Sequence, residues 1–203
     1  QVPSPSPGSR ENQLWGVAFR AADDGWAVGR AWNVSVGEMS LTLHWDGSSW
    51  SVVQAVTSPG NTNFFSGVVA LSPSNVWAVG EVGNSIPFAD KPLIEHFDGS
   101  RWSTVTAANA GVPGRFFGVV AASATDIWAV GDQHASGSDG PGTTMIQHFT
   151  GSRWSAVPSP NGTTTGNLLF SVATAAGHAW AAGVEDPQAG CCTNTQVLQT
   201  DAA

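Results

Sequence analysis

The sequence predicts an all-β fold made of four copies of one repeat unit, each folded as a four-stranded antiparallel sheet. Three observations support this prediction. The tetrapeptide Trp-Ala-Val-Gly recurs with a period of about 51 residues, and two further markers recur in step with it. No long segment of the 203-residue chain has the hydrophobic periodicity of a helix.

The three markers keep a fixed order along the chain. The tetrapeptide, once in the variant Trp-Ala-Ala-Gly, lies at Trp26–Gly29, Trp77–Gly80, Trp128–Gly131 and Trp180–Gly183. A Gly-Val pair or its variant precedes it at Gly16–Ala18, Gly67–Val69, Gly118–Val120 and Ser171–Ala173. A heptapeptide that begins with His and ends with Trp follows it at His44–Trp50, His96–Trp102 and His148–Trp154. Three registers that repeat together identify a repeat protein.

Each unit is expected to contain four short strands. In the first unit these are Leu14–Phe19, Trp26–Ala31, Leu41–Trp45 and Trp50–Val56. Asp46-Gly47 separates the last two strands, and this dipeptide tolerates the positive φ that a tight hairpin turn requires. Linkers rich in Pro, Ser, Gly and Asn lead from one unit to the next.

A single sheet of this kind cannot bury both of its faces, but sheets stacked around an axis bury them against each other. The repeat therefore predicts a single β-propeller domain whose blades span residues 11–61, 62–112, 113–165 and 166–203. The last unit lacks a fourth strand, and residues 1–7 align with the end of one, so they would supply part of the closing strand. Edge pairing between two copies, and excision from a longer array, are the alternatives.

The motifs (Val/Ile)-Trp-Ala-Val-Gly and His-(Trp/Phe)-Asp-Gly-Ser-x-Trp-Ser resemble the tryptophan-rich propeller repeats of exported bacterial proteins. The hairpin Asp-Gly-x-x-Trp is also similar to hairpins of propeller lectins. It is more weakly similar to the Asp-box of sialidase-like propellers, in which a residue separates Asp from Gly. The resemblance covers nearly the whole chain and implies a propeller architecture, but it implies little about activity.

Composition restricts the partners and the compartment. The formal charge is −8, and Lys91 is the single lysine. A nucleic-acid binder needs a basic face, so this class of partner is not expected. No apolar run approaches the roughly 18 residues that a membrane span requires. The near absence of lysine, together with an N-terminus that looks trimmed, leads us to expect an exported, extracellular protein.

Residues that recur in every unit are expected to build the blades. Nine of the ten tryptophans lie at equivalent positions and are expected in the core: Trp26, Trp77, Trp128, Trp180, Trp50, Trp102, Trp154, Trp45 and Trp15. Three histidines on the third strand, His44, His96 and His148, are expected to make structural hydrogen bonds rather than to bind a metal. We expect neither a metal nor a cofactor.

Residues that break the repeat are the candidates for binding. The loops between strands two and three differ in every unit and span residues 30–40, 81–92, 132–144 and 184–195. They should emerge on the same face as the linkers between blades. The candidate ligand-binding residues on this face are Arg30, Trp32, Glu81, Phe88, Arg115 and Asp132. Aromatic rings beside hydrogen-bonding charges are typical of a sugar site, although ordinary solvated loops would also have such residues.

The sequence therefore favours a secreted, non-catalytic binding module, with a glycan ahead of an extracellular protein as ligand. A structural surface or matrix protein, assembled as a homo-oligomer through blade edges, is one alternative. A propeller hydrolase or lyase is the other, because Glu81 and Asp132 would supply paired carboxylates. The chain has none of the common hydrolase or nucleotide-binding motifs and no tyrosine, the nucleophile of sialidases.

The two cysteines, Cys191 and Cys192, are adjacent in the last variable loop. In an exported protein, neighbouring thiols tend to oxidise, with each other or with a second chain. We favour a vicinal disulfide, which would strain the intervening peptide.

Overall fold

The computed structural model describes residues 2–56, 62–83, 90–134, 142–159, 161, 166–185 and 194–201. These residues form strands, turns and extended segments, and they include no helix that could cross a membrane. The first sheet contains β1 (Glu11–Ala21), β2 (Asp24–Asn33), β3 (Gly37–Trp45) and β4 (Trp50–Val52). The second contains β5 (Thr62–Ser72), β6 (Asn75–Gly83), β7 (Lys91–Phe97) and β8 (Trp102–Thr104).

The third sheet contains β9 (Gly114–Ser123), β10 (Asp126–Gln133), β11 (Thr143–Phe149) and β12 (Trp154–Val157). The fourth contains β13 (Asn167–Ala175), β14 (His178–Glu185) and β15 (Asn194–Asp201). Strands pair antiparallel in chain order within every sheet. The prediction of four repeated antiparallel sheets is confirmed. The described part of the fourth sheet has three strands rather than four, as the alignment of the last unit led us to expect.

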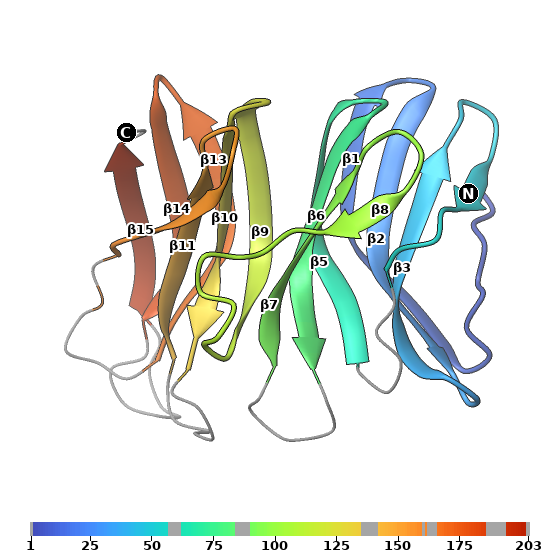
Figure 1. Ribbon diagram of the computed structural model, residues 1–203, viewed down its shortest axis with the longest axis horizontal. Coiled ribbons are helices and arrows are strands. Elements are labelled where there is room, and N and C mark those ends of the chain that lie inside the picture. Colours follow the sequence, from blue (N-terminus) through green and yellow to red (C-terminus); the bar gives the residue numbers. More distant parts are fainter. Residues whose placement is uncertain are drawn as a thin grey trace.

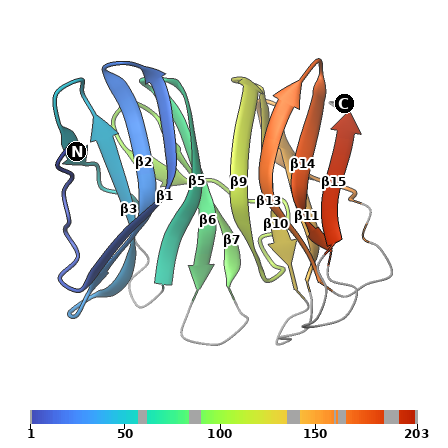
Figure 2. The ribbon, with the colours of Figure 1, turned by 180° about the vertical axis from the view of Figure 1, so that it is seen from behind.

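The four sheets stack side by side as blades of an open arc (Figures 1 and 2). The first strands, β1, β5, β9 and β13, contact one another in succession. The first and last blades lie at opposite ends of the arc, with the N-terminus at one end and the C-terminus at the other. The expected closure is not seen among the described residues: residues 2–7 form no strand, and β15 pairs only with β14. Val2 and Ser4 instead lie against the first blade.

The final glycine of each Trp-Ala-Val-Gly motif permits close contact between the first and second strands. These glycines lie opposite an irregularity in the first-strand ladder. A Cβ at Gly29, Gly80, Gly131 or Gly183 would lie 1.8–2.0 Å from a carbonyl oxygen of the first strand. The glycine is therefore required by packing in every blade.

The tryptophan of each motif packs into the next blade. Trp26 and Trp77 are 2% and 4% exposed, and each contacts two aromatic rings of the following blade. The strand-three histidines stack on these indoles and make the expected structural hydrogen bonds. His96 Nε2 lies 3.0 Å from Asn75 Oδ1, which also accepts a bond of 2.7 Å from Trp77 Nε1. His148 and Trp128 share Asp126 in the same way.

The expectation that nine tryptophans lie in the core is wrong for two of them. Trp15 is 47% exposed and Trp180 is 42% exposed, whereas Trp45 and Trp50 are half-buried. Trp180 is equivalent to Trp26, but no further blade packs against it among the described residues. Burial of these rings therefore depends on the place of the blade in the arc as well as on the repeat.

The predicted Asp-Gly hairpins are confirmed. Gly47 has φ +92° and Gly99 has φ +96°, the left-handed region that glycine tolerates best. Asp46 Oδ1 accepts hydrogen bonds of 2.8 Å from the backbone N–H groups of Ser48 and Ser49. Hydrogen bonds from serine and the backbone lower the pKa of Asp46 and lower that of Asp98 to about 2. These hairpins lie at the end of the sheets opposite the variable loops.

The linkers after β4 and β8 are each anchored on the next blade by a buried side chain. The backbone N–H of Val56 donates to Glu95 Oε2 at 3.1 Å, and that of Ala108 donates to Gln147 Oε1 at 2.9 Å. Glu95 and Gln147 occupy equivalent positions and are 1% and 0% exposed. Burial raises the pKa of Glu95 from its ordinary 4.5 to about 7, although the bond from Val56 partly opposes the rise.

Replacing Glu95 with glutamine should stabilise the protein above neutral pH by about 2 kcal/mol. The pKa of Glu95 is higher in the folded state than in the unfolded state. The free energy of unfolding therefore falls as the pH rises from 4.5 through 7, by about 3 kcal/mol in total. The new glutamine would bury an amide N–H group without an acceptor, which offsets part of the gain. The equivalent Gln147 donates to the sulfur of Met145, but Leu93 holds the position of Met145 in the second blade. Urea titrations at pH 5 and pH 8 check this. An equal effect of Glu95→Gln at both pH values would contradict it.

Candidate functional site

Charged side chains gather where the second strands end. The strands β6 and β10 point toward the lower end of the arc in Figure 1, the end from which the variable loops leave the sheets. Side chains from three successive blades meet there, and we call this set the charged rim: Arg30, Glu38, Glu81, Asp90, Arg115, Asp132 and His134. It contains four of the six binding candidates that the sequence predicts.

Arg30 is held within the first blade. Its guanidinium donates to Gln13 Oε1 at 3.1 Å, forms an ion pair with Glu38, and lies 3.4 Å from the Glu11 carboxylate. It also lies over the Trp15 ring at 5.4 Å. Since these contacts engage most of its donors, Arg30 positions Glu38 at the rim.

Trp32 lies at the outer side of the same blade. Its ring is half-buried, and the Arg10 guanidinium lies over it at 4.4 Å. Together with Glu11 and Glu38, these two residues line an open hollow of about 540 Å³. The hollow therefore combines an aromatic ring with two carboxylates and a guanidinium.

Glu81 is the most unusual group at the rim. Its side chain is 6% exposed, and its Oε2 atom is buried without a hydrogen-bond partner among the described residues. Burial raises the pKa of Glu81 to about 7, and the neighbouring carboxylates Asp90 and Asp132 add to the rise. Arg115 opposes it. Glu81 is therefore partly protonated near neutral pH.

Arg115 and Asp132 face each other across the β9–β10 pair. Arg115 Nε donates to Asp132 Oδ1 at 3.1 Å, and Asp132 is 0% exposed. Asp132 Oδ2 lies 2.5 Å from His134 Nε2, in an ion-pair contact without hydrogen-bond geometry. The Arg115 side chain is 40% exposed and lies 5.0 Å from the Phe117 ring. It is the cation that the rim presents to solvent.

Electrostatic coupling joins the blades at the rim. The Glu81 carboxyl responds to charges on Glu38 of the first blade, on Asp90 of its own blade, and on Arg115 and Asp132 of the third. Burial raises the pKa of Asp90 as well, against the opposing charge of Arg115. A backbone bond of 2.8 Å from Gly114 N to Asp90 O fixes the second and third blades together at this point. Carboxylates outnumber cations, so the rim is acidic.

The structure brings Glu81, Arg115 and Asp132 together and links Arg30 to them through Glu38. Trp32 lies beside this group at the hollow. Phe88, Cys191 and Cys192 lie outside the described residues, so the predictions made for them stay predictions. Sequence reasoning missed Glu38, Asp90 and His134. The sequence did not single them out, because each lies inside or at the far end of a loop that differs from unit to unit. Among described residues, no group of three or more side chains is arranged to hold a metal ion.

No family model matches the sequence, and no curated protein matches it. Among solved structures, "YCF48 bound to D1 peptide" is similar, with a TM-score of 0.51 over 94% of this chain and 60% of that chain, at 15% identity. A GH43 endo-arabinanase from Bacillus licheniformis has a TM-score of 0.47 over 95% and 73% of the chains, at 9% identity. This chain thus spans less than two thirds of the YCF48 structure. The YCF48 structure is a β-propeller, and likeness at this identity shows the fold alone: this chain has a β-propeller fold.

Proposed function

We propose that this protein is an exported, non-catalytic binding module that holds a carbohydrate at the charged rim. Glu81 carries the proposal. It is buried, no described residue forms a hydrogen bond with one of its oxygens, and charges from three blades surround it. An unsatisfied buried acceptor costs about 1–3 kcal/mol, and a ligand hydroxyl that donates to it removes this cost.

A sugar suits the rim because its hydroxyls both donate and accept. The carboxylates of Glu81 and Asp90 supply acceptors, and Arg115 supplies a partly exposed donor. The Trp32 ring at the hollow offers a surface for the apolar face of a second sugar unit. An extracellular protein is the second ligand class, because the YCF48 structure of similar fold is solved with a bound peptide.

Binding should depend on Glu81 but not on Glu95. Screening the chain on a glycan array identifies the ligand, and calorimetry then measures its affinity for variants. Glu81→Gln should lower the affinity for the glycan at least about tenfold, because the variant loses one hydrogen bond to a charged group. Glu95→Gln is the matched control, because Glu95 is equally buried, has a similarly raised pKa, and lies between blades away from the rim.

Equal loss of affinity in both variants would mean that the effect comes from folding rather than from a rim contact. An array without a hit, followed by retention of the chain on immobilised extracellular peptides, would move the proposal to the protein ligand class.

A glycoside hydrolase is the second candidate function, and the pKa of Glu81 favours it. A carboxyl group with a pKa of about 7 remains protonated enough near neutral pH to act as a general acid. Asp132 would be the second carboxylate. Incubation with a panel of aryl glycosides separates the two candidates. Release of the aryl alcohol by the wild-type chain, lost in Glu81→Gln, would make the protein a hydrolase; array binding without release supports the binding module.

A further inference from the structure

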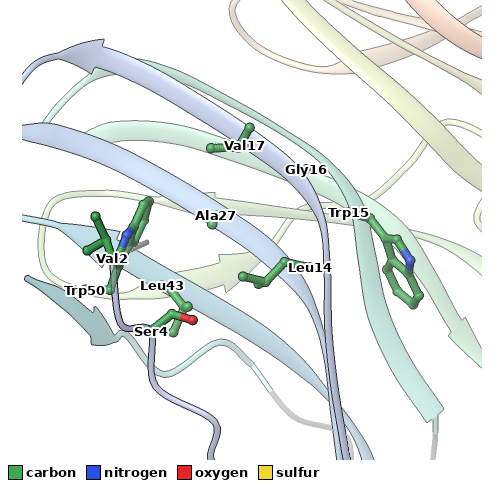
Figure 3. A pocket seen from close by; sticks show the side chains of 9 residues that line it. All are labelled: Val2, Ser4, Leu14, Trp15, Gly16, Val17, Ala27, Leu43 and Trp50. Atoms are coloured by element: carbon green, nitrogen blue, oxygen red, sulfur yellow. The ribbon is translucent and has the colours of Figure 1, made fainter.

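Two end faces of the arc have no neighbouring blade among the described residues. The first face is the side of the first blade that points away from the second, and it includes Leu14, Val17 and Trp50. Figure 3 shows these side chains around a hollow of about 310 Å³, which Val2 and Ser4 of the N-terminal segment also line. The last face is the side of the fourth blade that points away from the third, and it includes Trp180 and Val197. Both faces are apolar at these positions.

Residues of the first face are exposed where no described blade packs against them. Leu14 and Val17 are 44% and 65% exposed, whereas their equivalents in the second blade, Phe65 and Val68, are 0% and 8% exposed. In the second blade these positions pack against Trp26 and Val28 of the first blade in one apolar cluster. The first face is therefore the receiving half of a blade-to-blade interface.

The last face carries the opposite half. Trp180 is 42% exposed, whereas the equivalent indoles Trp26, Trp77 and Trp128 are 2%, 4% and 1% exposed. Val197, on the neighbouring strand β15, is 67% exposed. The last face therefore presents an indole of the kind that every other blade buries in its neighbour.

The receiving site for that indole is already formed on the first face. In the second blade, Phe97 and Trp102 have ring centroids 5.5 Å apart and receive Trp26 at 4.8 and 5.4 Å. In the first blade, the equivalent pair Trp45 and Trp50 lies 5.6 Å apart at a similar tilt, 48° against 46°.

The third blade repeats this arrangement. Phe149 and Trp154 lie 5.6 Å apart and receive Trp77 at 4.8 and 5.7 Å. The pair Trp45 and Trp50 thus has the geometry of two occupied aromatic sites.

We propose that the last face of one copy docks on the first face of a second copy, with Trp180 placed between Trp45 and Trp50 of the partner. Such a contact joins two different surfaces, so a second contact of the same kind closes a ring of two copies. The ring would contain eight blades, within the usual range of propellers. The two faces of one chain lie at opposite ends of the arc and do not meet each other (Figures 1 and 2).

Complementation between two variants tests this proposal. Light scattering after size-exclusion chromatography should give the mass of two copies for the wild-type chain. Trp180→Asp and Val17→Asp should each give one copy, because each variant damages one half of both contacts. A mixture of the two should again give two copies, since it retains one intact contact. Val112→Asp, which changes a 40% exposed valine in the linker between the second and third blades, should behave as wild type.

Three results would overturn the proposal. The first is a wild-type chain that runs as one copy at every concentration. The second is pairing of Val17→Asp but not of Trp180→Asp, which would indicate that two last faces pair with each other. The third is a mixture that stays at one copy although circular dichroism shows that both variants are folded.

Discussion

Alanine in place of Trp102 should lower the free energy of unfolding by about 3–5 kcal/mol. The indole is 4% exposed and lies between two blades. Its ring is 5.4 Å from Trp26 of the preceding blade and 5.5 Å from Phe97 of its own. The substitution therefore opens a cavity at a blade-to-blade interface. Urea titration in dilute solution, followed by circular dichroism, measures the loss.

Trp50→Ala is the matched control for this prediction. Trp50 holds the equivalent position in the first blade and is half-buried, and its described aromatic contacts are with Phe19 and Trp45 of its own blade. Its loss should therefore cost less, about 2 kcal/mol. Equal losses for Trp50→Ala and Trp102→Ala would show that packing between blades contributes little at Trp102.

Gly80→Ala should destabilise the protein by about 3 kcal/mol or more. A Cβ at this position would lie 2.0 Å from the carbonyl oxygen of Phe64 and 2.8 Å from the Cα of Phe65. Both atoms belong to the backbone of β5, so a side-chain rotation cannot relieve the clash. The strands β5 and β6 would have to separate within the second blade.

Gly111→Ala provides the control for the glycine prediction. Gly111 lies in the linker between the second and third blades, and no atom lies within 4 Å of the position that its Cβ would occupy. Its stability should stay within about 0.5 kcal/mol of wild type. If thermal denaturation gave similar midpoints for Gly80→Ala and wild type, the close approach of β5 and β6 would be contradicted.

The sequence predicted those features of the fold that depend on short-range chemistry. The Asp46-Gly47 hairpin follows from the φ that glycine tolerates, and the tetrapeptide tryptophans follow from their period. The exposure of Trp180 was not predictable in this way. Its motif is nearly the same as that of Trp26, and the two differ in that a neighbouring described blade packs against Trp26 but not against Trp180. That difference is a property of the assembled arc.

The residues of the candidate site also differ in whether the sequence predicts them. Glu81 and Asp132 were found because they follow the repeated glycine and differ from unit to unit. Asp90 and His134 were missed, because nothing in the sequence of their loops indicates that Asp90 lies near Glu81 or that His134 lies against Asp132. Asp90 reaches the rim from the start of β7, and His134 from the end of β10. Loop residues that repeat in no unit give no periodic signal.

The measurement that tests the central claim most directly is hydrogen–deuterium exchange of the chain with and without the glycan that it binds most tightly on the array. Binding at the charged rim predicts slower exchange at the ends of β6 and β10 and at the start of β9, where Glu81, Asp132 and Arg115 lie. The Asp46-Gly47 and Asp98-Gly99 hairpins should be unchanged. Protection confined to these hairpins, at the opposite end of the sheets, would contradict the account.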